Sequence, residues 1–550
     1  MMRFFPAIFV GCAAILTASA AQAQLACIPI DTIDVAGTTL LTTAEINGAL
    51  APFEGACLDL EGINAALEAV TFLYVDRGYV TARAYLPEQN IADRSLDITV
   101  VEGELSAVRF NGEERPIWEA IVFPSLAGKA ANLREIEQGL EIIRGMPAYN
   151  ATMEISAGAA EGQSILEVTA IADKPWTARV GIDNQGTPGS GQYQGTVNLT
   201  YDHLLGLNES WALNLSRGTE EYPFSYDTGG AASESAGLSV RFPYGRWAFE
   251  TNYQYSGYET DTLGPITAIG TDGWTHTATI GLSRVMHRNQ ISKTILSTSV
   301  EWRENVNRIA EIQINASSRT LASARLDLEH ERAFLGGSLT AALGYEQGLD
   351  ALGAEVAPDP LVGPNAQFEL GDFTINYFRP WQTGIGQISY SGTLRGQYSE
   401  DVLYGNYQFG VGGFSSVRGV NRGTVDLPPD PENPDAAARR DIGIFRGSSG
   451  AYWRNDLIWV PELSLPADLG ALQIYAGLDA GIVDVADSDF SPTLVGSAVG
   501  MRLTGGTYTA DFSWQQLLSG PENFDDPASP LAGVFELPDG LFVASLSMRF

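Results

Sequence analysis

The 550-residue sequence predicts two small α+β modules followed by an all-β domain, a transmembrane antiparallel β-barrel of about sixteen strands. Residues 24–175 mix short strand patterns with amphipathic helices, whereas residues 176–550 show a period of two and no helical signal. In that second part, apolar side chains alternate with polar ones and aromatic residues stand at the segment ends. This pattern is typical of a barrel wall between lipid and a polar interior.

The first 23 residues are predicted to be a secretory signal peptide. Arg3 supplies a positive charge, residues 4–16 form an apolar run too short to span a bilayer, and residues 21–23 have the small-x-small pattern of a cleavage site. One of the three cysteines lies inside this segment. Export leads to an oxidising compartment, so Cys27 and Cys57 are expected to form a disulfide; the alternative is two free buried thiols.

Two modules of similar pattern are expected at residues 24–104 and 105–175. In the first, residues 42–45 form a capping box that opens a helix, and a second helix runs from Leu60 to a stop at Gly78. Strands are predicted at residues 28–35, 80–86 and 96–101. The same order recurs in the second module, with strands at 106–110, 152–156 and 165–171 and helices at 116–123 and 133–144.

The barrel is expected to occupy residues 176–550. Tyr193, Leu199 and Tyr201 face one way along a strand whose intervening residues are polar. The last segment alternates up to Phe550, which is expected to serve as the C-terminal signal for membrane insertion. A large soluble β-sandwich or propeller would also alternate, but no blade or repeat signature is present in the sequence.

Composition and motifs disfavour several other classes of protein. A formal net charge of −34 argues against a nucleic-acid partner, and no stretch after the signal reaches the 18 uncharged apolar residues of a membrane helix. No nucleophile elbow or nucleotide loop is present, so no enzymatic activity and no cofactor are expected. Nor is a metal site expected, because the four histidines lack metal-ligand spacing; they are His203, His276, His287 and His330.

Two short motifs place single charges among small and apolar residues of the predicted barrel. The first is Val417-Arg418-Gly419, and the second is the strand segment in which Gly477 and Gly481 flank Asp479. An unpaired charge is costly in such surroundings, so Arg418 and Asp479 are expected to pair and to fix a moving or gating loop. The alternative is a flexible Gly/Ser loop and an unrelated aspartate.

Several segments resemble the two-partner secretion transporters of the haemolysin secretion/activation (ShlB/FhaC/HecB) family, within the POTRA-barrel outer-membrane assembly superfamily. Residues 77–89 and 100–103 are similar to that family's first POTRA domain, and residues 183–186, 191–195 and 204–208 to its barrel entry. Residues 417–419, 454–457 and 477–481 resemble its signature loop and the strands that follow.

Three departures accompany the resemblance. Val420 stands where the family usually has an aromatic residue, and residues 426–441 form a Pro- and Asp-rich insertion expected to be a solvated excursion. The short stretch between the signal and Cys27 leaves no room for the helix that plugs the pore in many members. The loop that contains Arg418 is expected to close the pore instead.

The resemblance implies a pore-forming transporter in the bacterial outer membrane, in contact with its lipid, with both POTRA domains in the periplasm. These domains would capture an unfolded exported partner, a large adhesin- or haemolysin-like β-helical exoprotein, and the barrel would pass it to the surface. Val417, Arg418 and Gly419 would form the gating loop, and Gly477, Asp479 and Gly481 the strand that anchors it. The alternatives are a barrel-assembly insertase, which usually has more POTRA domains, and a passive porin, which has none.

Overall fold

The computed structural model describes residues 27–550 apart from 125, 187–190, 224–230, 264–267, 357–362, 421–422, 427–438, 443–444, 464, 467–469, 485–490 and 521–539. The predicted signal peptide, residues 1–23, lies outside the described residues. The chain divides into two compact units. One holds the residues up to Ser106 with Gly128–Leu133 and Ala157–Ser164; the other holds Ala107–Ala127, Arg134–Ser156 and Ile165–Phe550.

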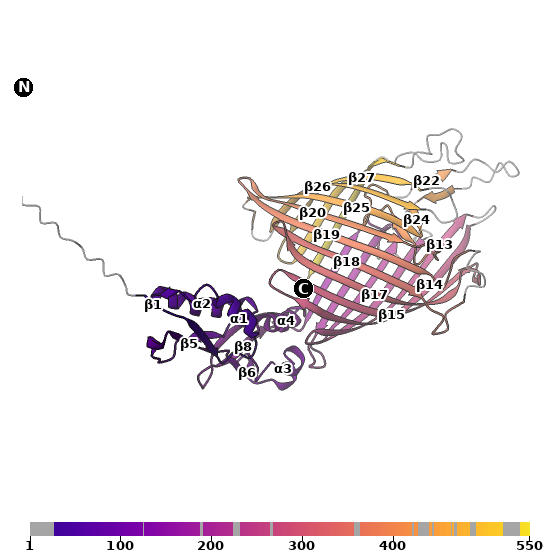
Figure 1. The fold of residues 1–550 in the computed structure, drawn as a ribbon. Coiled ribbons are helices and arrows are strands. Elements are labelled where there is room, and N and C mark those ends of the chain that lie inside the picture. The colour runs from indigo at the N-terminus through magenta and orange to yellow at the C-terminus, as the bar shows by residue number, and fades with distance from the viewer. Residues whose placement is uncertain are drawn as a thin grey trace, which may run out of the picture. The chain divides into compact units, whose positions relative to one another are not determined.

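The first module is a small sheet with two helices (Figure 1). Its elements are β1 (Ile28–Pro29), β2 (Thr32–Ala36), α1 (Thr43–Leu50), β3 (Cys57–Leu58), α2 (Leu60–Asp76), β4 (Arg83–Tyr85), the 3-10 helix η1 (Ile91–Asp93) and β5 (Ser95–Val101). The main sheet has the order β2-β5-β4, so β4 is an edge strand. The predicted capping box is present, because Thr42 and Glu45 exchange side-chain to backbone hydrogen bonds at the start of α1.

Two predicted strands of the first module differ from expectation. The strand expected at residues 28–35 is divided into β1 and β2, which pair with β3 and β5, respectively. The pattern at residues 80–86 predicted a continuous strand, but β4 covers only Arg83–Tyr85. The preceding residues form tight turns instead, in which Val80 N donates to Gly78 O and Ala82 N donates to Tyr79 O. These turns directly follow the end of α2 and occupy the first half of the segment that was predicted to be a strand.

The second module repeats this order. It contains β6 (Glu104–Phe110), α3 (Pro116–Val122), α4 (Leu133–Arg144), β7 (Asn150–Ala157) and β8 (Gln163–Ile171), in a sheet of order β6-β8-β7. Pro116 stands at the first position of α3, where its missing N–H costs no hydrogen bond. The rings of Phe110 and Trp118 pack edge to face in its core.

Sixteen long strands among the described residues close into an antiparallel barrel, which confirms the predicted architecture. They are β9 (Trp176–Asp183), β10 (Tyr193–Asp202), β11 (Ser210–Thr219), β12 (Ala231–Tyr244), β13 (Trp247–Leu263), β14 (Ala268–Arg288), β15 (Ser292–Ile309), β17 (Arg319–Phe334), β18 (Gly337–Gly348), β19 (Glu369–Thr383), β20 (Gly386–Tyr398), β25 (Ser449–Pro461), β26 (Ala471–Asp484), β27 (Thr493–Thr504), β28 (Tyr508–Ser519) and β29 (Leu541–Arg549). The two-residue strand β16 (Ile312–Gln313) adds to the end of β15.

The barrel closes where the last strand meets the first. β29 pairs with β28 on one side and with β9 on the other. Phe550 extends this closure, because its amide donates to Ala178 O at 2.8 Å and its carbonyl accepts from Ala178 N at 3.2 Å. Its ring is exposed, as expected for a residue on the outer face.

Between β20 and β25 the chain leaves the wall and forms two short antiparallel strand pairs, one enclosed in sequence by the other. β21 (Phe409–Val411) pairs with β24 (Phe445–Gly447), and β22 (Gly423–Asp426) pairs with β23 (Arg439–Ile442). Residues 427–438 of the predicted solvated insertion lie outside the described residues.

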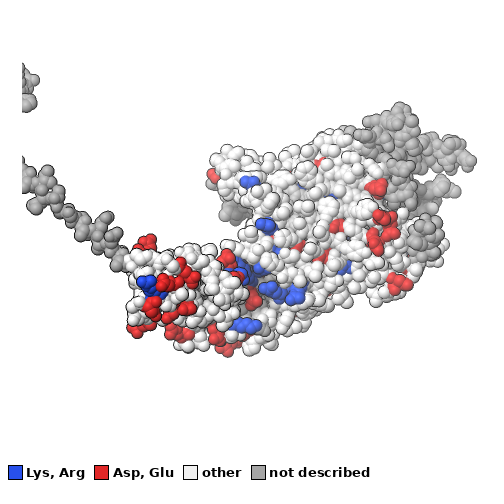
Figure 2. Space-filling model, viewed as in Figure 1, with Lys and Arg blue, Asp and Glu red and all other residues white. Residues whose placement is uncertain are grey.

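The surface of the barrel agrees with the alternation of its strands. Large apolar side chains such as Leu199, Phe249, Leu343 and Trp453 are exposed along the strands. Figure 2 shows that much of the visible wall carries no charge, and that Asp and Glu gather on the N-terminal module and near one end of the barrel. Among the described residues, no helix combines the length and hydropathy needed to cross a membrane.

Candidate functional site

The chain segment after β21 forms a tight turn that places Arg418 against the barrel wall. Gly412 and Gly413 adopt φ values of 116° and 81°, which side-chain-bearing residues rarely adopt. The Ser416 hydroxyl closes the turn, because Oγ accepts from Gly412 N and donates to Gly412 O, both at 2.8 Å. As a result, the next residues run along β26 to β28 with their side chains buried.

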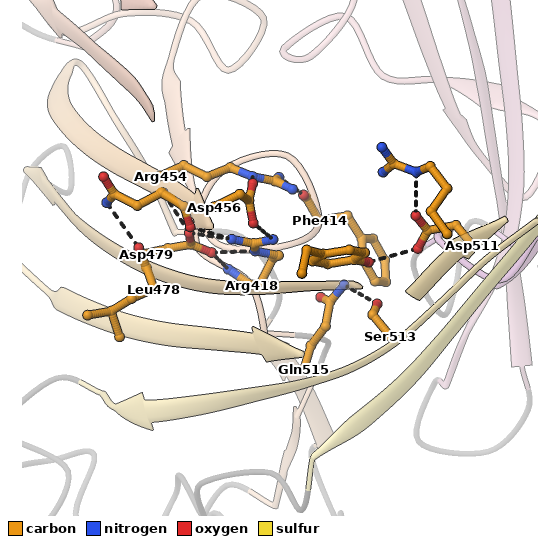
Figure 3. A network of polar contacts seen from close by, with 12 residues as sticks. Phe414, Arg418, Arg454, Asp456, Leu478, Asp479, Asp511, Ser513 and Gln515 are labelled. Atoms are coloured by element: carbon orange, nitrogen blue, oxygen red, sulfur yellow. Dashed lines mark hydrogen bonds and ion pairs between the residues drawn. The ribbon is translucent and has the colours of Figure 1, made fainter. Parts of the chain in front are cut away.

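Arg418 is the largest fully buried side chain that the structure describes, with 2% of its surface exposed. Its Nε and Nη2 donate to the two oxygens of Asp479 at 2.7 and 2.8 Å, which makes the pair bidentate (Figure 3). Its Nη1 donates to Asp456 Oδ1 at 2.6 Å, and Nη2 also donates to Asn455 O at 3.2 Å. The structure thus brings Arg418 and Asp479 together, as expected, and adds a second carboxylate.

Asp479 collects hydrogen bonds from several directions. Its side chain is fully buried and accepts from the Arg418 backbone N at 3.1 Å and from Asn455 N at 3.3 Å, in addition to the guanidinium. Such an arrangement satisfies the lone pairs of a buried carboxylate, without which the charge would be very costly to bury. Backbone and side chain of Arg418 are therefore held by the same group.

A second arginine balances the charges. Arg454 Nε lies 3.6 Å from Asp456 Oδ2, and Arg454 Nη1 donates to Phe414 O in the turn before Arg418. Two guanidinium groups and two carboxylates thus form one neutral cluster on β25, β26 and the loop (Figure 3). Charge neutrality inside the cluster reduces the cost of keeping it out of water.

The glycines of the strand motif make room for the loop. Gly477, Asp479 and Gly481 alternate onto one face of β26. A Cβ on Gly477 would lie 2.0 Å from Arg418 Nη2, and one on Gly481 would lie 2.6 Å from Val411 Cγ1. The spacing Gly-x-Asp-x-Gly therefore combines one charged partner with two positions where only glycine lets the loop approach.

Apolar packing surrounds the charged cluster. Val417 and Val420 are buried together with Val411, Val483 and Leu517. Val420 contributes to this cluster and not to the ion pairs. The backbone is equally close, since a Cβ on Gly419 would lie 2.1 Å from Gln516 C.

The remaining predicted residues lie elsewhere. Cys27 and Cys57 form the expected disulfide in the first module, with Cα atoms 5.2 Å apart. The four histidines do not gather, and in the part of the chain that the structure describes no three His, Cys, Asp or Glu side chains could hold a metal ion together. His203, for example, accepts a hydrogen bond from Trp118 Nε1 at 3.0 Å.

Sequence reasoning missed Asp456 and Arg454 as members of the cluster. Both lie in the segment 454–457 that resembled the family, but no role followed from the resemblance. The signal that could have identified them is their position on the strand. Arg454 and Asp456 alternate onto the inward face of the strand that directly precedes the Asp479 strand. In the pairing of these two strands, Arg454 lies opposite Asp479 and Asp456 lies opposite Gly477.

Comparison with known proteins is consistent across sequence and structure. The family profile "Haemolysin secretion/activation protein ShlB/FhaC/HecB" matches residues 162–426 and 442–503. A ShlB-type POTRA profile matches residues 28–103, and another POTRA profile matches residues 104–157.

Individual relatives are similar over most of their length. The outer membrane transporter CdiB of Escherichia coli is 33% identical over 506 residues, which cover 88% of this chain and 78% of the relative. The hemolysin transporter protein ShlB of Serratia marcescens is 28% identical over 398 residues, 72% of this chain and 70% of the relative. The solved structure of CdiB from Escherichia coli matches with a TM-score of 0.84 at 30% identity, covering 97% of this chain and 92% of that one.

Proposed function

The chain belongs to the haemolysin secretion/activation (ShlB/FhaC/HecB) family of outer-membrane two-partner secretion transporters, and from this premise we propose which client it exports and how it binds it. The client is a large exported protein with an adhesin- or haemolysin-like β-helical fold, which arrives in the periplasm unfolded. The first POTRA domain, residues 28–103, binds an extended segment of this client, and the barrel carries it to the surface.

The observation that carries this proposal is an open strand edge beside an apolar groove in the first POTRA domain. β4 is the edge of its sheet, and the groove between β4 and α2 is lined by Leu67, Thr71, Phe72, Val75, Arg83 and Ala84. Phe72 and Val75 are exposed, by 67% and 39%. An extended peptide can add to such an edge through its backbone while its side chains enter the groove, which demands little of the client's sequence.

One backbone amide on this strand edge already makes a hydrogen bond within the domain. Ala84 N, on β4, donates to the Thr71 hydroxyl of α2 at 3.2 Å. This bond occupies the outward amide that a client strand would use. Client binding therefore exchanges a side-chain hydrogen bond for a backbone one, which is close to neutral in hydrogen bonding and leaves apolar burial in the groove as the driving force.

The Arg418 cluster supports a loop that closes the pore and moves during export. Its charges are buried and satisfied, so the loop rests in one defined position against β25 to β28. No nucleotide motif is present in the sequence, and folding of the client outside the cell would supply the free energy of transport.

A deletion experiment tests the proposal. The gene is deleted in the bacterium that encodes this chain, and the proteins of the cell surface and culture fluid are compared with those of the parent strain. We expect the loss of one large β-helical exoprotein, with the other barrel proteins unchanged. Broad loss of barrel proteins would instead support an insertase, and no change at all would contradict both functions.

A further inference from the structure

A second part of the same loop contacts the barrel wall ahead of Arg418. Residues 399–408 connect β20 to β21, and hydrogen bonds of their backbone and side chains hold them in place. Asp401 accepts from Asn365 Nδ2 at 3.0 Å and from Glu369 N at 2.8 Å, and Leu403 N donates to Ser448 Oγ at 3.0 Å. This segment is therefore folded and attached to the start of β19.

Two side chains of the segment lie in an apolar cluster on the wall. Leu403 and Tyr407 are 0% and 8% exposed, and they pack on Leu321 of β17 and on Phe368 and Leu370 at the start of β19. The rings of Phe368 and Tyr407 are 4.4 Å apart between centroids. The contact thus buries an aromatic pair and three leucines.

The cluster lies on the inner face of the barrel. Leu321 shares its face of β17 with Ser323 and Arg325, and Leu370 shares its face of β19 with Asp372, to which Arg325 is paired at 2.7 Å. The interior face of a membrane barrel is ordinarily polar. An apolar patch there is stable only while something covers it, and Leu403 and Tyr407 cover it.

Most of the buried contact of Tyr407 is made by its ring, and its hydroxyl lies near Glu301 and Ser323. Arg303 Cζ of β15 lies 5.1 Å from the ring centroid, within cation–π range, and Arg303 Nη1 donates to the neighbouring Asn406 O at 3.4 Å. The Tyr407 hydroxyl is 3.5 Å from Glu301 Oε1, at the outer limit of a hydrogen bond. Loss of the ring should therefore weaken the contact far more than loss of the hydroxyl alone.

We propose that Tyr407 is a positioning residue of the pore loop: it holds the residues before the turn at 412–416 against β15, β17 and β19. Arg418 holds the residues after that turn against β25 and β26. This inference rests on the proposed role of the loop in closing the pore. The two contact areas lie on either side of β20. The contact at Tyr407 depends on burial of apolar surface, and the contact at Arg418 combines apolar packing with buried charges. The loop leaves its resting position only when both contacts are released.

The test uses purified full-length protein in planar lipid bilayers, where channel opening is recorded without any client. Tyr407→Ala should raise the fraction of time spent open by about tenfold or more, because truncating a buried aromatic removes much of the packing at that contact. Leu403→Ala, in the same cluster, should also raise the fraction of time that the channel spends open. Tyr407→Phe, which keeps the ring, should change opening much less than Tyr407→Ala.

Two controls separate positioning from general damage. Tyr398→Ala removes an exposed tyrosine only nine positions away and should leave opening unchanged. Heat-dependent mobility on SDS gels reports whether each barrel is folded. Folded Tyr407→Ala or Leu403→Ala protein with parental opening would overturn the proposal, as would equal effects of Tyr407→Phe and Tyr407→Ala. Because no client is involved, this result is independent of the deletion experiment.

Discussion

Gly477 shows at the residue scale how little space separates the loop from the barrel wall. Its missing Cβ leaves room for Arg418 Nη2 and Asp456 Oδ1, which lie 2.0 and 2.6 Å from where that atom would be. A side-chain terminus can usually move aside, but the guanidinium is bound by Asp479 and Asp456 together. Any shift that relieves the clash therefore lengthens hydrogen bonds inside a buried cluster.

Gly477→Ala should consequently loosen the loop without changing any charge. We expect a cost of roughly 1–3 kcal/mol at the contact, as for other overpacked buried sites. Export should fall more than the amount of folded barrel in the membrane, and Arg418→Ala should do the same more strongly. Quantitative blots of exported client and of the heat-modifiable barrel measure the two effects.

Gly371→Ala is the matched control, since a Cβ on this strand glycine would meet no atom within 4 Å. It lies on β19 of the same barrel. Equal loss of export in both variants would mean that the crowding at Gly477 is irrelevant.

At the scale of the element, Glu102 ties the sheet of the first POTRA domain to its helices. It follows β5, and its carboxylate accepts hydrogen bonds from Thr39 N at 2.6 Å, Leu40 N at 2.8 Å and the Tyr74 hydroxyl of α2 at 2.8 Å. Burial alone would raise the pKa of Glu102, but these hydrogen bonds outweigh it and lower the pKa below its usual value.

The lowered pKa predicts how this domain responds to acid. The stabilisation is complete above the ordinary carboxyl pKa and is lost as the pH falls through the lower pKa of the folded state. Glu102→Gln should destabilise the domain by about 1–3 kcal/mol at pH 7, since hydrogen bonds to a charged acceptor are lost. It should also reduce the further loss on acidification.

Hydrogen exchange of residues 27–101 in the full-length protein, corrected for the intrinsic effect of pH, measures both changes. The exposed Glu88 provides the comparison, and Glu88→Gln should match the parent protein at every pH. If Glu102→Gln and the parent lose protection in parallel below pH 5, the carboxylate is not the source of the acid response.

For the molecule as a whole, two modules and a barrel of about sixteen strands could be predicted because burial imposes a period on every strand and helix. Arg418 and Asp479 could be paired because each is a lone charge among small residues. Asp456 and Tyr407 could not be identified in this way. An aspartate facing the lumen looks like any polar inward residue, and a tyrosine between Gly405, Asn406 and Gln408 looks like part of a loop. Their roles depend on contacts between the loop and strands of the barrel wall, which the pattern of the sequence does not show.

In the proposed function, capture of the client and its passage belong to two different compact units of the chain. The proposed groove lies in the first unit, on α2 and β4, and the loop cluster lies in the second, on β25 and β26. Changes at independent sites that share no partners usually add in free energy, so their effects on a rate multiply. The chain therefore predicts that capture and gating can be impaired independently.

Phe72→Glu and Gly477→Ala test this independence. A charge in the groove should lower export several-fold through weaker binding of apolar client side chains, while channel currents in planar bilayers stay as in the parent. Leu60→Glu is the control, because Leu60 lies on the same helix, is also 67% exposed and does not line the groove. In the double variant, the two fractional losses of export should multiply. Equal losses of export from Phe72→Glu and Leu60→Glu would exclude the groove as the binding site. If the double variant exports as much client as the weaker single variant, Phe72 and Gly477 act in the same step of export.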